Sequence, residues 1–239
     1  MSREHIDKTR LKKNRGEIIV VCICVMLVAV ILVMLVAFNK NKEFVYNKHL
    51  DKTVISIDDE NITLKDFSYY VYIVEKQIND MAIKYNPDDP NDFWNIHFKN
   101  SLDSVFTRDY AKQLAKDLCE YDYVMEKETA PYNIYVTESE KESLRSDAKD
   151  TYGDFSQKAK DNTKLSEDDI YNILCRRKLV EKYASRAANQ IKDDGFEGDS
   201  ASLLDYDGDY YKEIIKAKYN ITENDDLLNK ITMGRVTVN

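Results

Sequence analysis

Glycine, proline and histidine are scarce in this chain, which has six, three and three of them among 239 residues. Barrels and sandwiches need glycine and proline at their many tight turns, so this composition disfavours such folds and excludes collagen-like or linker-rich architectures. The sequence also lacks a glycine-rich phosphate loop, a nucleophile elbow and a cysteine–histidine cluster with metal-ligand spacing. We therefore expect a mostly α-helical protein that is not an enzyme and that has no metal site, cofactor or small-molecule substrate.

One apolar run interrupts this composition. Ile18 to Phe38 are 21 consecutive apolar residues, and as a helix they would cross the roughly 30 Å hydrocarbon core of a bilayer. The run predicts a transmembrane helix at 18–38. It contains no ionisable residue, which argues against a transporter or a proton relay.

The flanks of this run predict its orientation. Residues 1–17 form a basic tail with six Lys or Arg against three Asp or Glu, so the positive-inside rule places the N-terminus in the cytoplasm. A cleaved signal peptide is the alternative, but the run exceeds the 7 to 15 residues of such peptides and has no small-x-small cleavage pattern. We expect a single-pass anchor in the cell membrane, with most of the chain outside.

The rest of the chain is predicted to be a juxtamembrane linker at 39–52 and one extracytoplasmic domain at 53–239. Residues 40–239 contain 29 basic and 40 acidic residues, a net charge of −11. Such a surface repels phosphate groups, so nucleic acid is not an expected partner.

The sequence of this domain predicts several helices. Apolar residues at spacings of three and four predict helices from Thr63 to about Lys84, from about Leu102 to Glu128 and from Ser166 to about Ile191. A polar helix is expected at 138–152 and a short one at 209–218. Capping boxes are predicted at three helix starts, pairing Thr63 with Asp66, Thr137 with Glu140, and Ser166 with Asp169.

Two short strands are expected at the ends of the domain. Thr53–Ile57 alternates before a turn, and Ile231–Val238 has the composition of a strand. We expect these segments to pair and to draw the ends of the domain together. Trp94, between them, is interpreted as a packing anchor.

Cys119 and Cys175 are the cysteines of the exterior part, and both fall within predicted helices. Each fits a small buried apolar residue, and an exported location also permits a disulfide between them if their Cα atoms approach within about 7 Å.

The order of these motifs resembles a known family. An I-T-x-x-D-F helix start at Ile62–Phe67 is followed by a segment with Trp94, then by Y-N-I-Y-V-T-E-S-E at Tyr132–Glu140 and L-S-E-D-D-I at Leu165–Ile170. This order, over about Thr53 to Ile191, resembles the N-terminal chaperone domain of the SurA and PrsA group of extracytoplasmic foldases. The resemblance implies a membrane-tethered form in a Gram-positive-like envelope.

That group usually also carries a parvulin-type prolyl isomerase domain with active-site histidines. The 48 residues after Ile191 contain no histidine, so we expect no isomerase module. The predicted function is a tethered holdase that binds unfolded, exported polypeptides. A structural or scaffolding subunit that holds one specific partner in an envelope complex is the alternative.

Aromatic residues supply the expected client-binding surface. Among 17 tyrosines, Tyr69, Tyr72 and Tyr123 fall beside the main apolar stripes of their predicted helices. Tyrosine offers apolar area at low entropic cost and a hydroxyl for main-chain groups, which suits sequence-tolerant contacts. These three residues are the predicted client-binding residues.

Overall fold

A computed structural model describes residues 44–100 and 103–238, together with Met26, Val28 and Val30. The chain divides into two units, Met1–Phe44 and Val45–Asn239, and the second is called the body below. No helix among the described residues is long and apolar enough to cross a membrane. The predicted span at 18–38 lies outside those residues, except for the three named, which are helical. The predicted tail at 1–17 also lies outside them.

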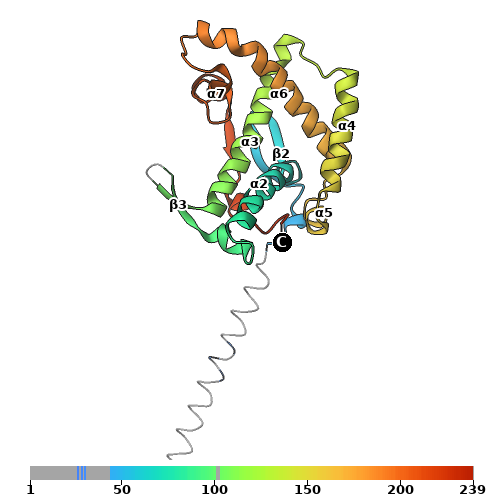
Figure 1. Ribbon diagram of the computed structural model, residues 1–239, viewed down its shortest axis with the longest axis vertical. Helices are drawn as coiled ribbons and strands as arrows, with labels where there is room; N and C mark the ends of the chain where they lie inside the picture. Colours follow the sequence, from blue (N-terminus) through green and yellow to red (C-terminus); the bar gives the residue numbers. More distant parts are fainter. Residues whose placement is uncertain (1–25, 27, 29, 31–43, 101–102, 239) are drawn as a thin grey trace, which may run out of the picture. The chain divides into compact units, whose positions relative to one another are not determined.

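The body is mostly helical, as the sequence predicted, and three long helices form its centre. These are α2 (Leu64–Tyr85), α3 (Thr107–Thr129) and α6 (Glu167–Asp193). Helix α3 packs against both α2 and α6, and α4 (Glu138–Gly153) lies along α6 (Figure 1). The core of the body therefore lies where α2, α3 and α6 meet.

Shorter elements connect and flank these helices. They are η1 (Tyr46–Lys48), η2 (Pro90–Asn95), η3 (Ala130–Tyr132), α5 (Gln157–Thr163), α7 (Ser200–Leu204), the π-helix η4 (Tyr211–Ile215), η5 (Lys216–Lys218) and α8 (Asp225–Leu228). The η1 turn lies within residues 39–52, which were predicted to be a linker, but it belongs to the body. Tyr46 is buried there, and its hydroxyl lies 3.0 Å from Ser68 Oγ of α2.

All three predicted capping boxes are confirmed. Thr63, Thr137 and Ser166 each accept a hydrogen bond from the third helical residue, whose carboxylate accepts one from the cap in return. These reciprocal bonds satisfy main-chain N–H groups that the first turn of a helix leaves unpaired. The starts of α2, α4 and α6 are thus determined by local sequence.

Replacing Ser166 by alanine removes the side-chain half of the cap of α6. We expect the free energy of unfolding to fall by about 1 kcal/mol. Urea unfolding of the full chain in detergent micelles would measure it. Ser146→Ala, at an exposed position within α4, is the control and should leave stability nearly unchanged. A loss no larger than that of the control would contradict the role of this cap.

The two ends of the body meet in a small antiparallel sheet of order β2–β1–β5. Strand β1 (Thr53–Ile57) is confirmed and pairs with β2 (Glu60–Thr63). The predicted partner of β1 at Ile231–Val238 is wrong, because β5 (Ile221–Glu223) occupies that edge. Asn224 fixes this register: its main-chain N–H donates to the Val54 oxygen, and its side chain donates to the Thr53 oxygen.

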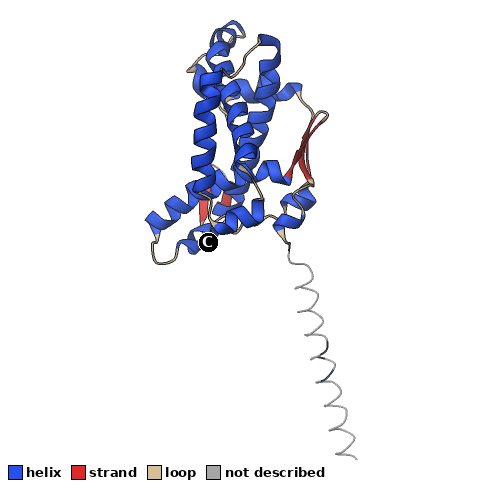
Figure 2. Cartoon of the chain, turned by 90° about the vertical axis from the view of Figure 1, so that its right-hand side faces the viewer, coloured by secondary structure: helices blue, strands red, loops and turns tan. Residues whose placement is uncertain are grey.

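A hairpin replaces the predicted start of the second long helix. Strands β3 (His97–Asn100) and β4 (Asp103–Phe106) pair in antiparallel register, and they project from the helices (Figure 2). Helix α3 therefore begins at Thr107, five residues later than predicted. The rings of His97 and Phe106 pack 3.7 Å apart at the base of the hairpin, so cross-strand pairing overrides the helical apolar spacing of this stretch.

Candidate functional site

Ile231–Val238, called the C-terminal segment below, is bound to the body as an irregular piece of chain with a turn at Met233–Gly234 and bends at residues 235–237. Its anchor is Glu75 of α2, which is completely buried. The Glu75 carboxylate accepts main-chain hydrogen bonds from Gly234 (2.7 Å), Val236 (3.2 Å), Thr237 (2.6 Å) and Val238 (3.3 Å). The Thr237 hydroxyl donates a fifth, at 2.6 Å. One buried carboxylate thus accepts hydrogen bonds from four main-chain N–H groups and one hydroxyl within residues 234–238.

Helix α5 holds the carbonyl groups of the same segment. Asn162 Nδ2 donates to the Val236 oxygen, Ser156 Oγ to the Thr237 oxygen and Lys158 Nζ to the Val238 oxygen, at 2.6 to 2.9 Å. Figure 1 accordingly marks the C-terminus beside α5. The C-terminal segment is therefore recognised largely through its main chain, between α2 on one side and α5 on the other.

Trp94 closes this cradle, here defined by Glu75, Trp94, Ser156, Lys158 and Asn162. The indole is 2% exposed, which agrees with the packing role predicted from the sequence. It lies against the Cα of Gly234, whose φ is +82°, and a Cβ atom at that position would collide with the ring. Glycine is needed here both for the positive φ and for the close approach.

A groove of about 380 Å³ continues from the end of the C-terminal segment. It is lined by Tyr72, Lys76, Asn79, Ile83, Pro90, Asn91, Asp154, Ser156, Thr237 and Val238. Lys76 Nζ forms an ion pair with Asp154 at 2.7 Å across it, and the hydrogen bond from Lys76 lowers the pKa of the Asp154 carboxyl. Six of the ten lining residues are polar or charged, and Tyr72, Ile83, Pro90 and Val238 supply the apolar part.

Three apolar side chains near the end of α2 are exposed. Met81 is 43%, Ile83 45% and Tyr85 66% exposed. Ile83 lines the groove itself, while the ring of Tyr85 packs on Phe93 of η2 at 5.4 Å between centroids. Ile83 therefore leaves apolar surface open to solvent in the groove beside the C-terminal segment.

The three predicted client-binding tyrosines lie in two different places, and all are buried, with exposures of 3% for Tyr69, 7% for Tyr72 and 5% for Tyr123. Tyr72 forms the inner wall of the groove and packs on Phe155, with 4.0 Å between centroids. Tyr69 and Tyr123 instead face α6. The expectation that all three border an open surface is therefore corrected: Tyr69 and Tyr123 belong to the core.

Tyr69 and Tyr123 contribute to a partly buried polar cluster around two arginines of α6, of which Arg177 is exposed. The guanidinium of Arg176 stacks over the Tyr123 ring at 3.6 Å. Arg177 pairs with Asp122 at 3.4 Å, and the Asp122 carboxylate also accepts a hydrogen bond from Tyr70 (3.0 Å). Burial raises the pKa of Asp122 to about 6, although Arg177 and Tyr70 oppose this shift.

Cys119 and Cys175 are both free thiols, so the disulfide that the sequence left open is not formed. Cys119 is completely buried beside the arginine cluster, and burial raises the pKa of its thiol well above the usual value. It acts as a small apolar residue of the core. Within the described residues, no group of three or more His, Cys, Asp or Glu side chains is placed to hold a metal ion.

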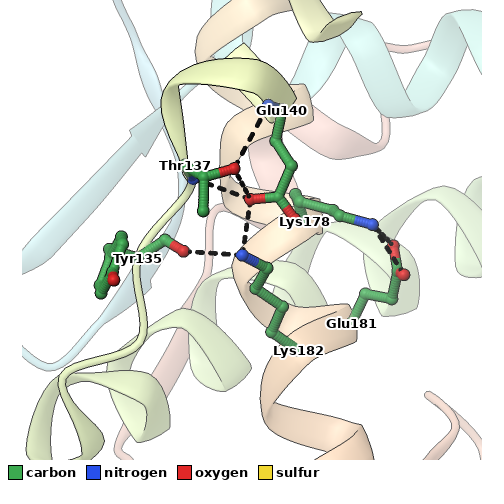
Figure 3. A network of polar contacts seen from close by, with 6 residues as sticks. All are labelled: Tyr135, Thr137, Glu140, Lys178, Glu181 and Lys182. Atoms are coloured by element: carbon green, nitrogen blue, oxygen red, sulfur yellow. Dashed lines mark hydrogen bonds and ion pairs between the residues drawn. The ribbon is translucent and has the colours of Figure 1, made fainter.

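Polar contacts hold α4 against α6. Lys182 Nζ donates to Glu140 Oε2 (2.6 Å) and to the Tyr135 main-chain oxygen (2.9 Å), as Figure 3 shows. The hydrogen bonds from Lys182 and from the Thr137 backbone lower the pKa of Glu140 to about 2. Helix α4 buries only Ala148 of its sixteen residues, so its attachment depends largely on such polar contacts.

Glu75 and Asp122 were not predicted from the sequence, although the sequence contains a pattern that marks each of them. Glu75 follows Val71 by four residues and precedes Ile78 by three, so it lies on the apolar stripe of α2. Asp122 lies three residues after the buried Cys119 on α3. A carboxylate on the apolar face of an amphipathic helix needs a buried partner, and this pattern marks both residues.

Comparison of the chain with family models, curated proteins and solved structures finds no match.

Proposed function

We propose that this protein is a membrane-tethered extracytoplasmic holdase that binds extended stretches of unfolded, exported polypeptides in the groove between α2, η2 and α5. The observation that carries the proposal is the C-terminal segment itself. It is an irregular stretch of polypeptide held through its main-chain N–H and C=O groups, directly beside the groove.

Main-chain recognition is suited to a holdase because every polypeptide presents the same N–H and C=O groups. The groove offers further groups that can form hydrogen bonds with a client's main chain, namely Asn79, Asn91 and the Lys76–Asp154 pair. Tyr72 remains a client contact within this proposal, through the inner wall of the groove, whereas Tyr69 and Tyr123 do not.

The exposed apolar side chains at the end of α2 support the same function. Unfolded chains expose apolar residues, and burial of apolar area stabilises a complex by roughly 25 cal/mol per Å². Ile83 provides such area within the groove, and Met81 and Tyr85 provide it elsewhere on α2. The predicted span at 18–38 would tether the body to the membrane from which exported chains emerge.

Aggregation of a chemically denatured client, followed by light scattering with the full chain in lipid nanodiscs, tests this proposal. The wild-type chain should slow aggregation. Ile83→Asp places a charge on the wall of the groove and should weaken client retention about tenfold, the effect of losing one buried aliphatic contact. Tyr135→Asp, at a 70% exposed position outside the groove lining, is the matched control and should behave as wild type.

Unrelated clients separate this function from the scaffolding alternative. A holdase slows the aggregation of several clients of different sequence, whereas a scaffold that holds one partner leaves them unaffected. Failure of the wild-type chain with every client, or equal activity of Ile83→Asp and wild type, would contradict the proposed site.

A further inference from the structure

The C-terminal segment has the contacts of a bound peptide. Ile231, Met233, Val236 and Thr237 are each at most 4% exposed, while Arg235 between them is exposed. Its hydrogen bonds to Glu75, Ser156, Lys158 and Asn162 join residues at least 74 positions apart in sequence. The cradle is thus built by distant parts of the chain, as a binding site is.

Two positions make the cradle selective. The residue at 234 must be glycine, because of its positive φ and the adjacent Trp94 ring. The residue at 237 contributes the hydroxyl that donates to Glu75 at 2.6 Å, and a buried carboxylate binds charge-assisted donors strongly. Position 235 is free to vary because its side chain points to solvent.

We infer that the cradle is a peptide site selective for segments of the form Gly-x-x-Thr or Gly-x-x-Ser that can adopt the turn of the chain's own C-terminal segment, and that such client segments exchange with it. This inference rests on the proposed function and names the class of client. Thr237 and Val238 also line the groove, so a client that enters the cradle continues directly into it.

Exchange is physically feasible because a matching client segment would restore the same hydrogen bonds that the departing segment loses. The internal segment competes through its high effective concentration, which is on the order of millimolar for a tethered ligand. Weakening the internal segment should therefore uncover the site, and this dependence makes the inference testable.

Gly234→Val in the full chain is the test variant, because a valine side chain would collide with Trp94 and expel the internal segment. The probe is a fluorescent peptide with the sequence of residues 231–238, Ile-Thr-Met-Gly-Arg-Val-Thr-Val. We expect saturable binding to Gly234→Val that is at least about tenfold tighter than binding to wild type, whose cradle is occupied.

Two altered peptides test selectivity. Changing the probe's threonine at the position of 237 to valine removes one hydrogen bond to a charged group and should weaken binding by about tenfold or more. Changing its glycine to valine should abolish binding. Equal affinity of all three peptides for Gly234→Val, or equal affinity of the probe for Gly234→Val and wild type, would overturn the inference.

A Gly234→Val chain that fails to fold is still informative. Refolding it with the probe should then restore a cooperative thermal transition, whereas the glycine-to-valine peptide should not. Restoration by neither peptide would overturn the inference. These outcomes are separate from the proposed function, because the wild-type chain and Ile83→Asp test holdase activity without the probe.

Discussion

Glu75→Ala is expected to lower the free energy of unfolding by about 4 kcal/mol, among the largest effects of a single substitution in the body. The substitution removes the one acceptor for four main-chain N–H groups and the Thr237 hydroxyl. Buried donors left without a partner carry their full desolvation cost. Urea unfolding of the full chain in detergent micelles would measure the loss.

Glu75→Gln should lose less, because one amide oxygen still accepts hydrogen bonds while the NH₂ group faces the remaining donors. Glu142→Ala, at an exposed position of α4, is the control and should change stability by less than about 0.5 kcal/mol. A loss below about 1 kcal/mol for Glu75→Ala would show that the C-terminal segment contributes little to the fold and that its contacts with Glu75 are weak.

Asp122→Asn is expected to change the pH dependence of stability. The pKa of Asp122 is raised to about 6 in the folded protein by burial, so the folded state binds this proton more tightly than the unfolded state. The stabilisation of the folded state by the proton on Asp122 is complete below the ordinary carboxyl pKa. It is lost as the pH rises through 6. Over that range wild type should lose up to about 3 kcal/mol relative to Asp122→Asn.

Unfolding of both chains at a series of pH values from 4 to 8 would measure this difference. The asparagine amide is neutral, and its oxygen still accepts the hydrogen bond from Tyr70, so the variant reports mainly on the charge. The groups around Asp122 are Arg176, Arg177 and Glu126. Asp147→Asn, at an exposed position of α4, should run parallel to wild type. A difference that is constant with pH for Asp122→Asn would contradict the assignment.

The sequence did not predict that two of the three proposed client-binding tyrosines are buried against α6. Tyr69, Tyr72 and Tyr123 were selected because they lie beside the apolar stripes, but α6 covers Tyr69 and Tyr123 and supplies arginines to their rings and hydroxyls. Periodicity describes one helix at a time. It does not reveal that a third helix, with Arg176 and Arg177, packs against the flank of the stripe.

The C-terminal segment is a second case in which local sequence did not predict the tertiary contacts. Ile231–Val238 has a strand-like composition, yet β5 pairs with β1 and the segment binds Glu75 instead. β5 contains only one apolar residue, Ile221. The choice depends instead on Asn224, which joins β5 to β1 by two hydrogen bonds, and on a buried carboxylate 159 residues away from Gly234.

The sequence by itself determined the helical class, the starts of α2, α4 and α6, and strand β1, because caps and apolar spacing act over three to five residues and need no distant partner. Tertiary structure alone decided the cradle around Glu75, the arginine cluster around Asp122 and the groove beside Tyr72. Each of these joins charged or polar groups from separate elements, and burying a charge is favourable only where the fold brings its partners within hydrogen-bond distance.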